Sequence, residues 1–325
     1  MAIRLGIVMD PVAAINVDKD STLSMLWEAQ ARGWEIFYFE LKHLFLRDGI
    51  PYGEARPLTV ARDLTHWYQL GHVQDLSLSN LDVILMRKDP PFNEEYIYAT
   101  HLLEYAERLG VLVANKPQSL RDANEKMFAA WFPQCCPPTL VTRQVSRLKA
   151  FWHEHGDIVC KPLHGMGGEA IFHLSPHEVN ANVIFDMLTH TEARYIMAQK
   201  FIPAVKQGDK RILLVNGEPI PYALVRVPQG DEWRGNLAVG AKGMAKPLSA
   251  RDYWICAQVG PVLREKGLYF VGLDVIGEYL TEINVTSPTG IRELDAQCGL
   301  NIAGRLLDCI EAMISVHDKN NFMSS

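Results

Sequence analysis

Apolar and polar positions along the chain follow two different patterns, and the first occupies roughly the first third. Short apolar runs predict strands at 4–9, 35–39, 81–86 and 111–114. Amphipathic segments predict helices at 20–32, begun by Asp20-Ser21 and ended by Gly33, and at 96–109, ended by Gly110. Strands that alternate with helices predict an open, largely parallel sheet, whose ligands gather beyond the carboxyl ends of the strands. The span 47–78 fits neither period.

The second pattern begins after a new unit starts near Ser119. Short strands with hairpin-like turns such as Asn216-Gly217 predict an antiparallel sheet, from the runs at 158–161, 171–172, 195–201, 211–215 and 222–227. Helices are predicted at 252–266 and 301–316, with a frayed tail from Asp318 onward.

The segment 270–289 predicts a hairpin that carries acidic side chains. Two apolar runs, 270–276 and 280–285, flank a turn at 277–279. If Ile276 faces Leu280, then Asp274 faces Glu282, and Asn284 projects from the same face. Opposed carboxylates destabilise a sheet unless a hard cation such as Mg²⁺ lies between them. A solvated polar face or a shifted register is the alternative, but the apolar flanks favour the metal site.

A lysine and a glycine-rich turn follow one another in 161–168. Gly165, Gly167 and Gly168 would let backbone N–H groups approach phosphate oxygens, and Lys161 would supply a positive charge. The spacing matches neither the P-loop nor the dinucleotide fingerprint. A glycine-rich hairpin turn explains the segment equally well when it is taken alone.

Two further segments have weaker local signals. The chain at Gln199, Lys200 and Ile202 could present backbone groups to an adenine edge, although an ordinary strand exit fits as well. Asp209 could bind ribose hydroxyls and Arg211 could bind phosphate through its fork of donors. A surface turn of mixed charge is the alternative for this second pair.

The long polar segment 228–247, rich in glycine and carrying Arg234 and Asn236, is typical of a lid that keeps water from a reactive intermediate. A loop without function is the alternative. After the acidic hairpin, Ser287, Thr289 and Arg292 could hold a carboxylate beside the metal, or they could form a Pro-Gly turn with its helix cap.

Composition limits the classes of protein to which this chain could belong. The 325 residues suffice for two or three domains, and a net charge of -6 argues against bulk attraction to nucleic acid or anionic lipid. Six cysteines without zinc spacing predict reduced thiols of a cytosolic protein. We do not expect the first residues to form a signal peptide, because Asp10-Pro11 soon interrupts their apolar run. No apolar run approaches membrane-spanning length, and no nucleophilic triad is evident.

The order of these motifs resembles the ATP-grasp superfamily, and several segments are similar to bacterial glutathione synthetases. The segments are Gly-Ile-Val-Met-Asp10-Pro, Leu-Met-Arg87-Lys-Asp-Pro-Pro-Phe, Asn-Lys-Pro-Gln-Ser-Leu-Arg-Asp-Ala-Asn-Glu-Lys126, Gly-Asp-Lys-Arg211, Arg-Gly-Asn236-Leu-Ala and Leu-Thr-Glu282-Ile-Asn-Val-Thr-Ser-Pro-Thr. The resemblance spans 3 to about 312. It departs at Gly290, where members of the family can carry a cysteine.

The resemblance implies an α/β (α+β) fold. An N-terminal open parallel-sheet domain at 1–121 would precede an ATP-grasp domain at 122–312, whose two α+β subdomains enclose ATP, and a tail at 313–325. It also implies a reaction in which ATP phosphorylates the cysteinyl carboxylate of γ-glutamylcysteine. The amine of glycine then attacks the acyl phosphate, giving glutathione, ADP and phosphate. A cytoplasmic homo-oligomer, a dimer or a tetramer, is expected, without nucleic-acid or membrane partners.

The same resemblance implies roles for individual residues. Two Mg²⁺ ions, or Mn²⁺, would be held by Asp274, Glu282 and Asn284. The catalytic residues would be Arg211, Arg234 and Asn236. ATP would be bound by Lys126, placed early in a helix, and by Lys161, Gly165, Gly167, Gly168, Gln199, Lys200, Ile202, Asp209 and Arg211. The dipeptide would be bound by Asp10, Arg87, Ser287, Thr289 and Arg292.

Two other functions remain open at this level. One keeps the fold and changes the substrate, as in a dipeptide ligase or a glutamate-adding ligase. The other is a nucleotide-binding regulatory protein without turnover. The intact Asp274, Glu282 and Asn284 argue against the regulatory protein, because a protein without turnover has little need of all three.

Overall fold

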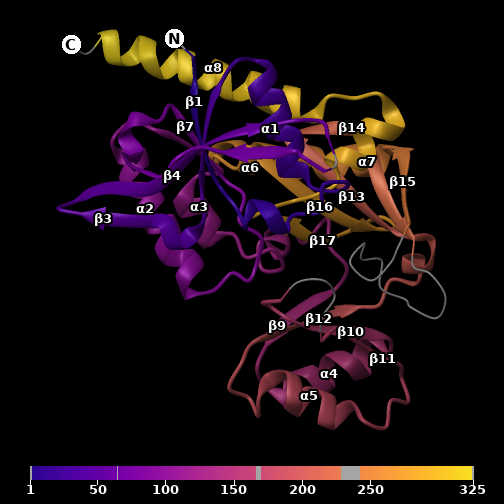
Figure 1. Cartoon of the computed structure of the whole chain (residues 1–325). Coiled ribbons are helices and arrows are strands. Elements are labelled where there is room, and N and C mark those ends of the chain that lie inside the picture. Colours follow the sequence, from indigo (N-terminus) through magenta and orange to yellow (C-terminus); the bar gives the residue numbers. More distant parts are fainter. Residues whose placement is uncertain (1, 64, 166–169, 228–241, 324–325) are drawn as a thin grey trace.

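The structure is a computed structural model that describes residues 2–63, 65–165, 170–227 and 242–323, with the side chains of 242 and 316–323 not described. Its strands form three sheets, around which the helices pack (Figure 1). Short 3-10 helices lie at Val12–Ala14, Leu41–His43, Leu78–Asn80, Ala129–Trp131 and Pro203–Gln207. No helix in these described ranges is long and apolar enough to cross a membrane.

The first sheet confirms the predicted parallel arrangement of the N-terminal part. Its strand order is β3-β4-β2-β1-β7-β8. The parallel strands are β1 (Arg4–Val8), β2 (Glu35–Phe39), β7 (Val83–Met86) and β8 (Leu112–Ala114). The helices are α1 (Ser21–Ala31), α2 (Glu94–Arg108) and α3 (Pro117–Asp122). Asp20 caps α1 by accepting a hydrogen bond from Leu23 N at 2.7 Å, as its sequence signal predicted.

The span that the periodicity left unassigned extends this sheet by antiparallel pairing. It forms β3 (Leu44–Arg47), β4 (Ile50–Val60), β5 (Tyr68–Leu70) and β6 (Gln74–Ser77). The long strand β4 pairs with β2, β3, β5 and β6. Because β4 contacts different partners along its length, its side chains lack one continuous apolar face.

The second sheet has the order β11-β10-β12-β9 and forms a small lobe of its own. Its antiparallel strands are β9 (Thr139–Thr142), β10 (Ile158–Pro162), β11 (Phe172–Leu174) and β12 (Ile196–Lys200). Helices α4 (Val145–His155) and α5 (Ala181–Thr189) cover one face, and this lobe lies apart at the bottom of Figure 1. A separate apolar cluster, which includes Leu148, Ile158 and Phe185, forms its core.

The third sheet is antiparallel and has the order β15-β14-β13-β16-β17. Its strands are β13 (Asp209–Val215), β14 (Glu218–Val227), β15 (Lys242–Pro247), β16 (Phe270–Ile276) and β17 (Tyr279–Asn284). Asn216 and Gly217 form the predicted turn between β13 and β14, with φ of 48° and 74°. The end of the predicted lid, 242–247, is instead strand β15, because it pairs with β14.

Helices α6 (Ala250–Glu265), α7 (Ile291–Cys298) and α8 (Ile302–Met323) pack with the third sheet and the N-terminal domain. The first and third sheets share their cores: one cluster contains Val113 of β8 and Val271 of β16, and another contains Leu5 of β1 and Ile302 of α8. The sheet that carries the acidic hairpin is therefore packed directly on the N-terminal domain.

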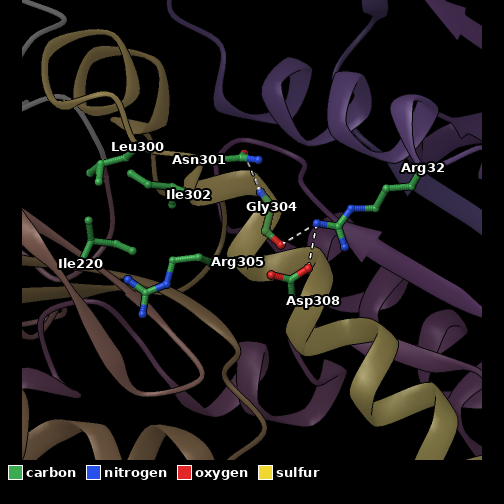
Figure 2. A pocket seen from close by; sticks show the side chains of 8 residues that line it. All are labelled: Arg32, Ile220, Leu300, Asn301, Ile302, Gly304, Arg305 and Asp308. Atoms are coloured by element: carbon green, nitrogen blue, oxygen red, sulfur yellow. Dashed lines mark hydrogen bonds and ion pairs between the residues drawn. The ribbon is translucent and has the colours of Figure 1, made fainter.

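Helix α8 continues to Met323, past the predicted end near 316, because helix propagation from a packed first half costs little per added residue. Arg32, at the end of α1, holds this helix. Its Nη2 donates to Gly304 O at 3.0 Å and lies 2.8 Å from Asp308 Oδ1 (Figure 2). These residues line a cavity of about 270 Å³ together with Ile220, Leu300, Asn301, Ile302 and Arg305.

Candidate active site

The acidic hairpin has the side-chain pairs that the sequence predicted, but its two strands pair in a different register near the turn. Ile276 pairs with Tyr279 rather than with Leu280, so the turn contains two residues, Gly277 and Glu278. An irregularity between Asp274 and Val275 then restores the predicted pairs. Asp274 faces Glu282, and Gly272 faces Asn284.

Thr281 is the extra residue of this bulge, and its Oγ1 donates to Asp274 O at 3.0 Å. Asn284 Nδ2 lies 3.2 Å from Asp274 Oδ2, which places the two side chains on the same face. The three predicted metal-binding side chains therefore lie together on β16 and β17.

Two arginines surround Asp274. Arg211 on β13 pairs with Asp274 across the sheet, and its Nε and Nη2 donate to the two carboxylate oxygens at 2.5 and 3.0 Å. Arg226 on β14 places Nη2 3.1 Å from Asp274 Oδ1. Burial alone would raise the pKa of Asp274, but Arg211 and Arg226 outweigh that effect and hold the pKa well below its usual range.

Two lysines approach Glu282 from other parts of the chain. Lys126 Nζ and Lys161 Nζ lie 3.7 and 3.5 Å from Glu282 Oε1, and both lysines are buried. Lys126 also forms an ion pair with Glu125. Burial would lower the pKa of Lys126, but the charges of Glu282 and Glu125 outweigh it and raise that pKa.

Lys126 does not lie in a helix, contrary to the prediction. Helix α3 ends at Asp122, and the side chain of Asn124 then accepts hydrogen bonds from Lys126 N and Met127 N at 3.1 and 3.0 Å. This turn is favoured because an asparagine side chain can bond to backbone N–H groups two and three residues later. It brings Lys126 to the acidic face.

Sequence reasoning missed Arg226 and Glu125. Asp209 faces Arg226 across β13–β14 only because the register shifts between Ile212 and Leu214. Continuing the pairs beside the Asn216-Gly217 turn without that shift would have placed Leu224 opposite Asp209. The sequence therefore contained no signal for Arg226, whereas Glu125 could have been considered as the acidic neighbour of Lys126.

Asp209 is partly buried, with 16% of its side chain exposed, and forms an ion pair with Arg226; the sequence had allowed either a contact with ribose or a surface turn of mixed charge. Burial raises the pKa of Asp209 to about 7, although the charge of Arg226 opposes that shift. Asp209 Oδ1 and Arg226 Nε are buried atoms that find no hydrogen-bond partner among the described residues. The pair lies next to Asp274, which Arg226 also contacts.

Among the residues that the structure describes, the charged groups at the hairpin nearly balance. Four carboxylates, those of Glu125, Asp209, Asp274 and Glu282, are matched by four cations, those of Lys126, Lys161, Arg211 and Arg226. Such mutual pairing offsets the high cost of burying charges.

The donors on β16–β17 suit a hard divalent cation, because two carboxylates and an amide project from one face. Within the described ranges, no group of three or more His, Cys, Asp or Glu side chains could hold a metal ion. A metal at the hairpin would thus depend on Asp274 and Glu282 with the Asn284 amide as the third protein ligand.

The predicted nucleotide-binding residues lie partly around this face. Gly165 O accepts from Lys126 Nζ at 3.4 Å, which connects the glycine segment to the site. Gln199 is buried and donates to Thr139 Oγ1 at 3.1 Å, and Lys200 is the exposed last residue of β12. Ile202 precedes the 3-10 helix Pro203–Gln207. Gly167, Gly168, Arg234 and Asn236 lie outside the described residues.

The predicted dipeptide-binding residues divide into two groups. Asp10 follows β1, lies 2.8 Å from Lys88 Nζ and accepts from Asp89 N at 2.9 Å. Arg87 is buried after β7 and donates to Pro288 O at 3.0 Å, between Ser287 and Thr289. The segment at 287–289 is thus attached to the carboxyl end of a parallel strand.

Arg292 is the only member of the second group. Its guanidinium donates to Val17 O and lies 4.6 Å from the ring centre of Trp27. Arg292 therefore contacts the N-terminal domain, and its role in binding the dipeptide stays a prediction.

Comparisons with known proteins agree with this geometry. The family described as "Prokaryotic glutathione synthetase, N-terminal domain" matches residues 3–121, and "Prokaryotic glutathione synthetase, ATP-grasp domain" matches residues 125–299. Glutathione synthetase of Pseudomonas putida is 57% identical over 311 residues, covering 96% of this chain and 98% of that protein. Glutathione synthetase of Escherichia coli K12 is 55% identical over 312 residues, covering 96% and 99%.

Solved structures of lower identity show the same fold. D-cycloserine synthetase DcsG superposes with a TM-score of 0.66 at 13% identity, covering 97% of this chain and 99% of that chain. The ATP-grasp ligase PsnB superposes with a TM-score of 0.63 at 17% identity, covering 95% and 97%. The chain has the ATP-grasp fold and belongs to the prokaryotic glutathione synthetase family.

Proposed function

We propose a course for the reaction of this chain, which is an ATP-dependent ligase that forms a peptide bond of glutathione. ATP transfers its γ-phosphoryl group to the cysteinyl carboxylate of γ-glutamylcysteine, giving ADP and an acyl phosphate. The amine of glycine attacks the acyl carbon, a C–N bond forms and phosphate leaves with the electrons of the C–O bond. The amine proton passes to phosphate or to solvent.

The convergence of four cations on the acidic hairpin is the observation that carries this proposal. Lys126, Lys161 and Arg211 come from three separate segments and meet at Glu282 and Asp274. Positive groups held in place before reaction stabilise the charge of a transferring phosphoryl group without having to reorganise. These three side chains would bind the phosphates of ATP.

The near balance of charges among the described residues supports a role for divalent cations. ATP brings about four negative charges to the site, and the four cations there are already matched by carboxylates. Asp274, Glu282 and Asn284 would hold two Mg²⁺ ions, or Mn²⁺. When bound, these ions neutralise phosphate charge and so allow a carboxylate to approach the γ-phosphorus.

The remaining sequence-derived roles fit this course and are part of the proposal. Asp10, Arg87, Ser287 and Thr289 would orient the dipeptide beside the hairpin. Gly165, with Gly167 and Gly168, would approach the phosphates, while the backbone at Gln199, Lys200 and Ile202 would contact adenine. Arg234 and Asn236 would arrive with the lid and exclude water. Arg292 would also bind the dipeptide, and Asp209 would contribute to the ATP site, as the sequence predicted.

Assembly and location complete the proposal. A homo-oligomer, as a dimer or tetramer, and a cytoplasmic location are supported by the likeness to bacterial glutathione synthetases. All six cysteines are free, which suits a reducing compartment.

Phosphate release from ATP and Mg²⁺ tests the proposal directly. Release that requires γ-glutamylcysteine and glycine together, with glutathione formed in equal amount, is expected. Turnover with another acid or amine but not with these two would reassign the substrates. Binding of ATP without any turnover across a screen of amino acids and dipeptides would instead indicate a regulatory protein.

A further inference from the structure

The side chain of Asn115 joins the N-terminal domain to the open end of the acidic hairpin. Its Nδ2 donates to Phe270 O at 2.9 Å and to Val285 O at 2.7 Å, while its Oδ1 accepts from Phe270 N at 2.9 Å. Carbonyl oxygens can only accept, so these partners fix the orientation of the amide. The side chain is buried, with 5% of its surface exposed.

The three hydrogen bonds reach both strands of the hairpin. Phe270 is the first residue of β16, and Val285 directly follows Asn284, the last residue of β17. Asn115 itself directly follows β8 of the parallel sheet. One carboxamide therefore connects the carboxyl end of a parallel strand to the ends of two strands, the strand that carries Asp274 and the strand that carries Asn284.

Other contacts attach the next segment of chain to the same domain. Arg87 holds Pro288 O, and Ser21 Oγ lies 3.2 Å from both Gly290 N and Ile291 N, which donate to it. These bonds hold the segment after β17, whereas the bonds of Asn115 hold the hairpin itself. Loss of Asn115 would leave two carbonyls and one N–H buried without partners.

We propose that Asn115 is a positioning residue for the ligase reaction. It holds the metal- and phosphate-binding hairpin in a fixed position relative to the dipeptide-binding end of the parallel sheet. This inference rests on the proposed function, in which ATP binds at the hairpin and the dipeptide binds beside Asp10 and Arg87. Because a misplacement of about 1 Å between reacting groups can slow a reaction about a hundredfold, this attachment controls the alignment of the two substrates.

The test compares Asn115→Ala with Ser119→Ala. Ser119 is buried nearby on α3 and donates to Lys266 O, which follows α6, so it joins the same two parts of the protein without touching the hairpin. Asn115→Ala should raise KM for γ-glutamylcysteine and lower kcat, each about tenfold, with KM for ATP within about twofold of wild type. Ser119→Ala should reduce stability but keep all three constants within about twofold.

Equal increases in KM for both substrates, or kinetic constants of Asn115→Ala that match those of Ser119→Ala, would overturn the inference. If Asn115→Ala does not fold, Asn115→Ser is measured in its place, because a hydroxyl can keep one of the three hydrogen bonds, and the same dipeptide-selective change is required. The wild type is assayed first. A wild type that makes no glutathione refutes the proposed function, whereas an active wild type with an unaffected variant refutes the role of Asn115 alone.

Discussion

Replacement of Arg226 by methionine should test whether the charged pair next to Asp274 and Asp274 itself act as one unit. Arg226 pairs with Asp209 and lies 3.1 Å from Asp274 Oδ1. Methionine keeps much of the apolar stem but leaves Asp209 without a cation. At an effective dielectric constant of about 20, a pair at about 3 Å attracts by about 5 kcal/mol, and desolvation offsets much of this. Removal of one partner from a buried pair costs about 3–5 kcal/mol, and we expect that loss here.

The double variant Arg226→Met with Asp209→Leu separates the pair from its surroundings. Removing both charges avoids the unpaired carboxylate, so the double variant should be more stable than Arg226→Met alone. Urea unfolding, followed by both circular dichroism and tryptophan fluorescence, measures each change in the free energy of unfolding. Additive losses in the double variant, or a loss below about 1 kcal/mol for Arg226→Met, would refute the coupling.

Four further predictions follow, two on the hairpin, one on a turn and one on a helix attachment. Asp274→Asn or Glu282→Gln should lower kcat/KM at least about a hundredfold at saturating Mg²⁺, and retained activity in a phosphate-release assay would exclude them as ligands. Because the pKa of Asp274 lies below its usual 3.8, the stability that this carboxylate contributes is fully present above about pH 4–5 and is lost as the pH falls below that value. The difference in unfolding free energy between wild type and Asp274→Asn should therefore shrink in acid, and a constant difference down to about pH 3 would contradict the assigned shift. Gly217→Ala should destabilise by about 1–3 kcal/mol in urea, because a Cβ there would lie 2.5 Å from Gly260 O at a φ of +74°, and an unchanged midpoint would be inconsistent with this turn. Arg32→Ala should expose backbone amides of α8 to hydrogen exchange more than those of β16, because it removes ion pairs that hold that helix, and equal exchange would refute this attachment.

The sequence determined the features that depend on local spacing. Strand and helix periodicity gave the parallel N-terminal sheet and most strands of the antiparallel part. The alternation of side chains along a strand placed Asp274, Glu282 and Asn284 on one face. These predictions succeeded because each needs only neighbouring residues, a known period or a turn of recognisable composition.

Only the tertiary structure decided the features that depend on irregular pairing or distant contact. The turn of the acidic hairpin is one residue shorter than predicted, and the bulge at Thr281 compensates for the difference. A second register shift places Arg226 opposite Asp209. The strands of 44–77 escaped prediction because β4 changes partners along its length.

The contacts of Asn115 and Lys161 show the physical reason most clearly. Asn115 meets Phe270 and Val285 across 155 and 170 residues of chain, and Lys161 meets Glu282 across 121. The periodicity of side chains and the composition of turns do not indicate which residues meet across such long separations in the sequence. The sequence by itself predicted the hairpin and its acidic face, whereas tertiary contacts brought Lys161 from the second sheet, and Lys126 and Asn115 from the chain after β8, to that hairpin.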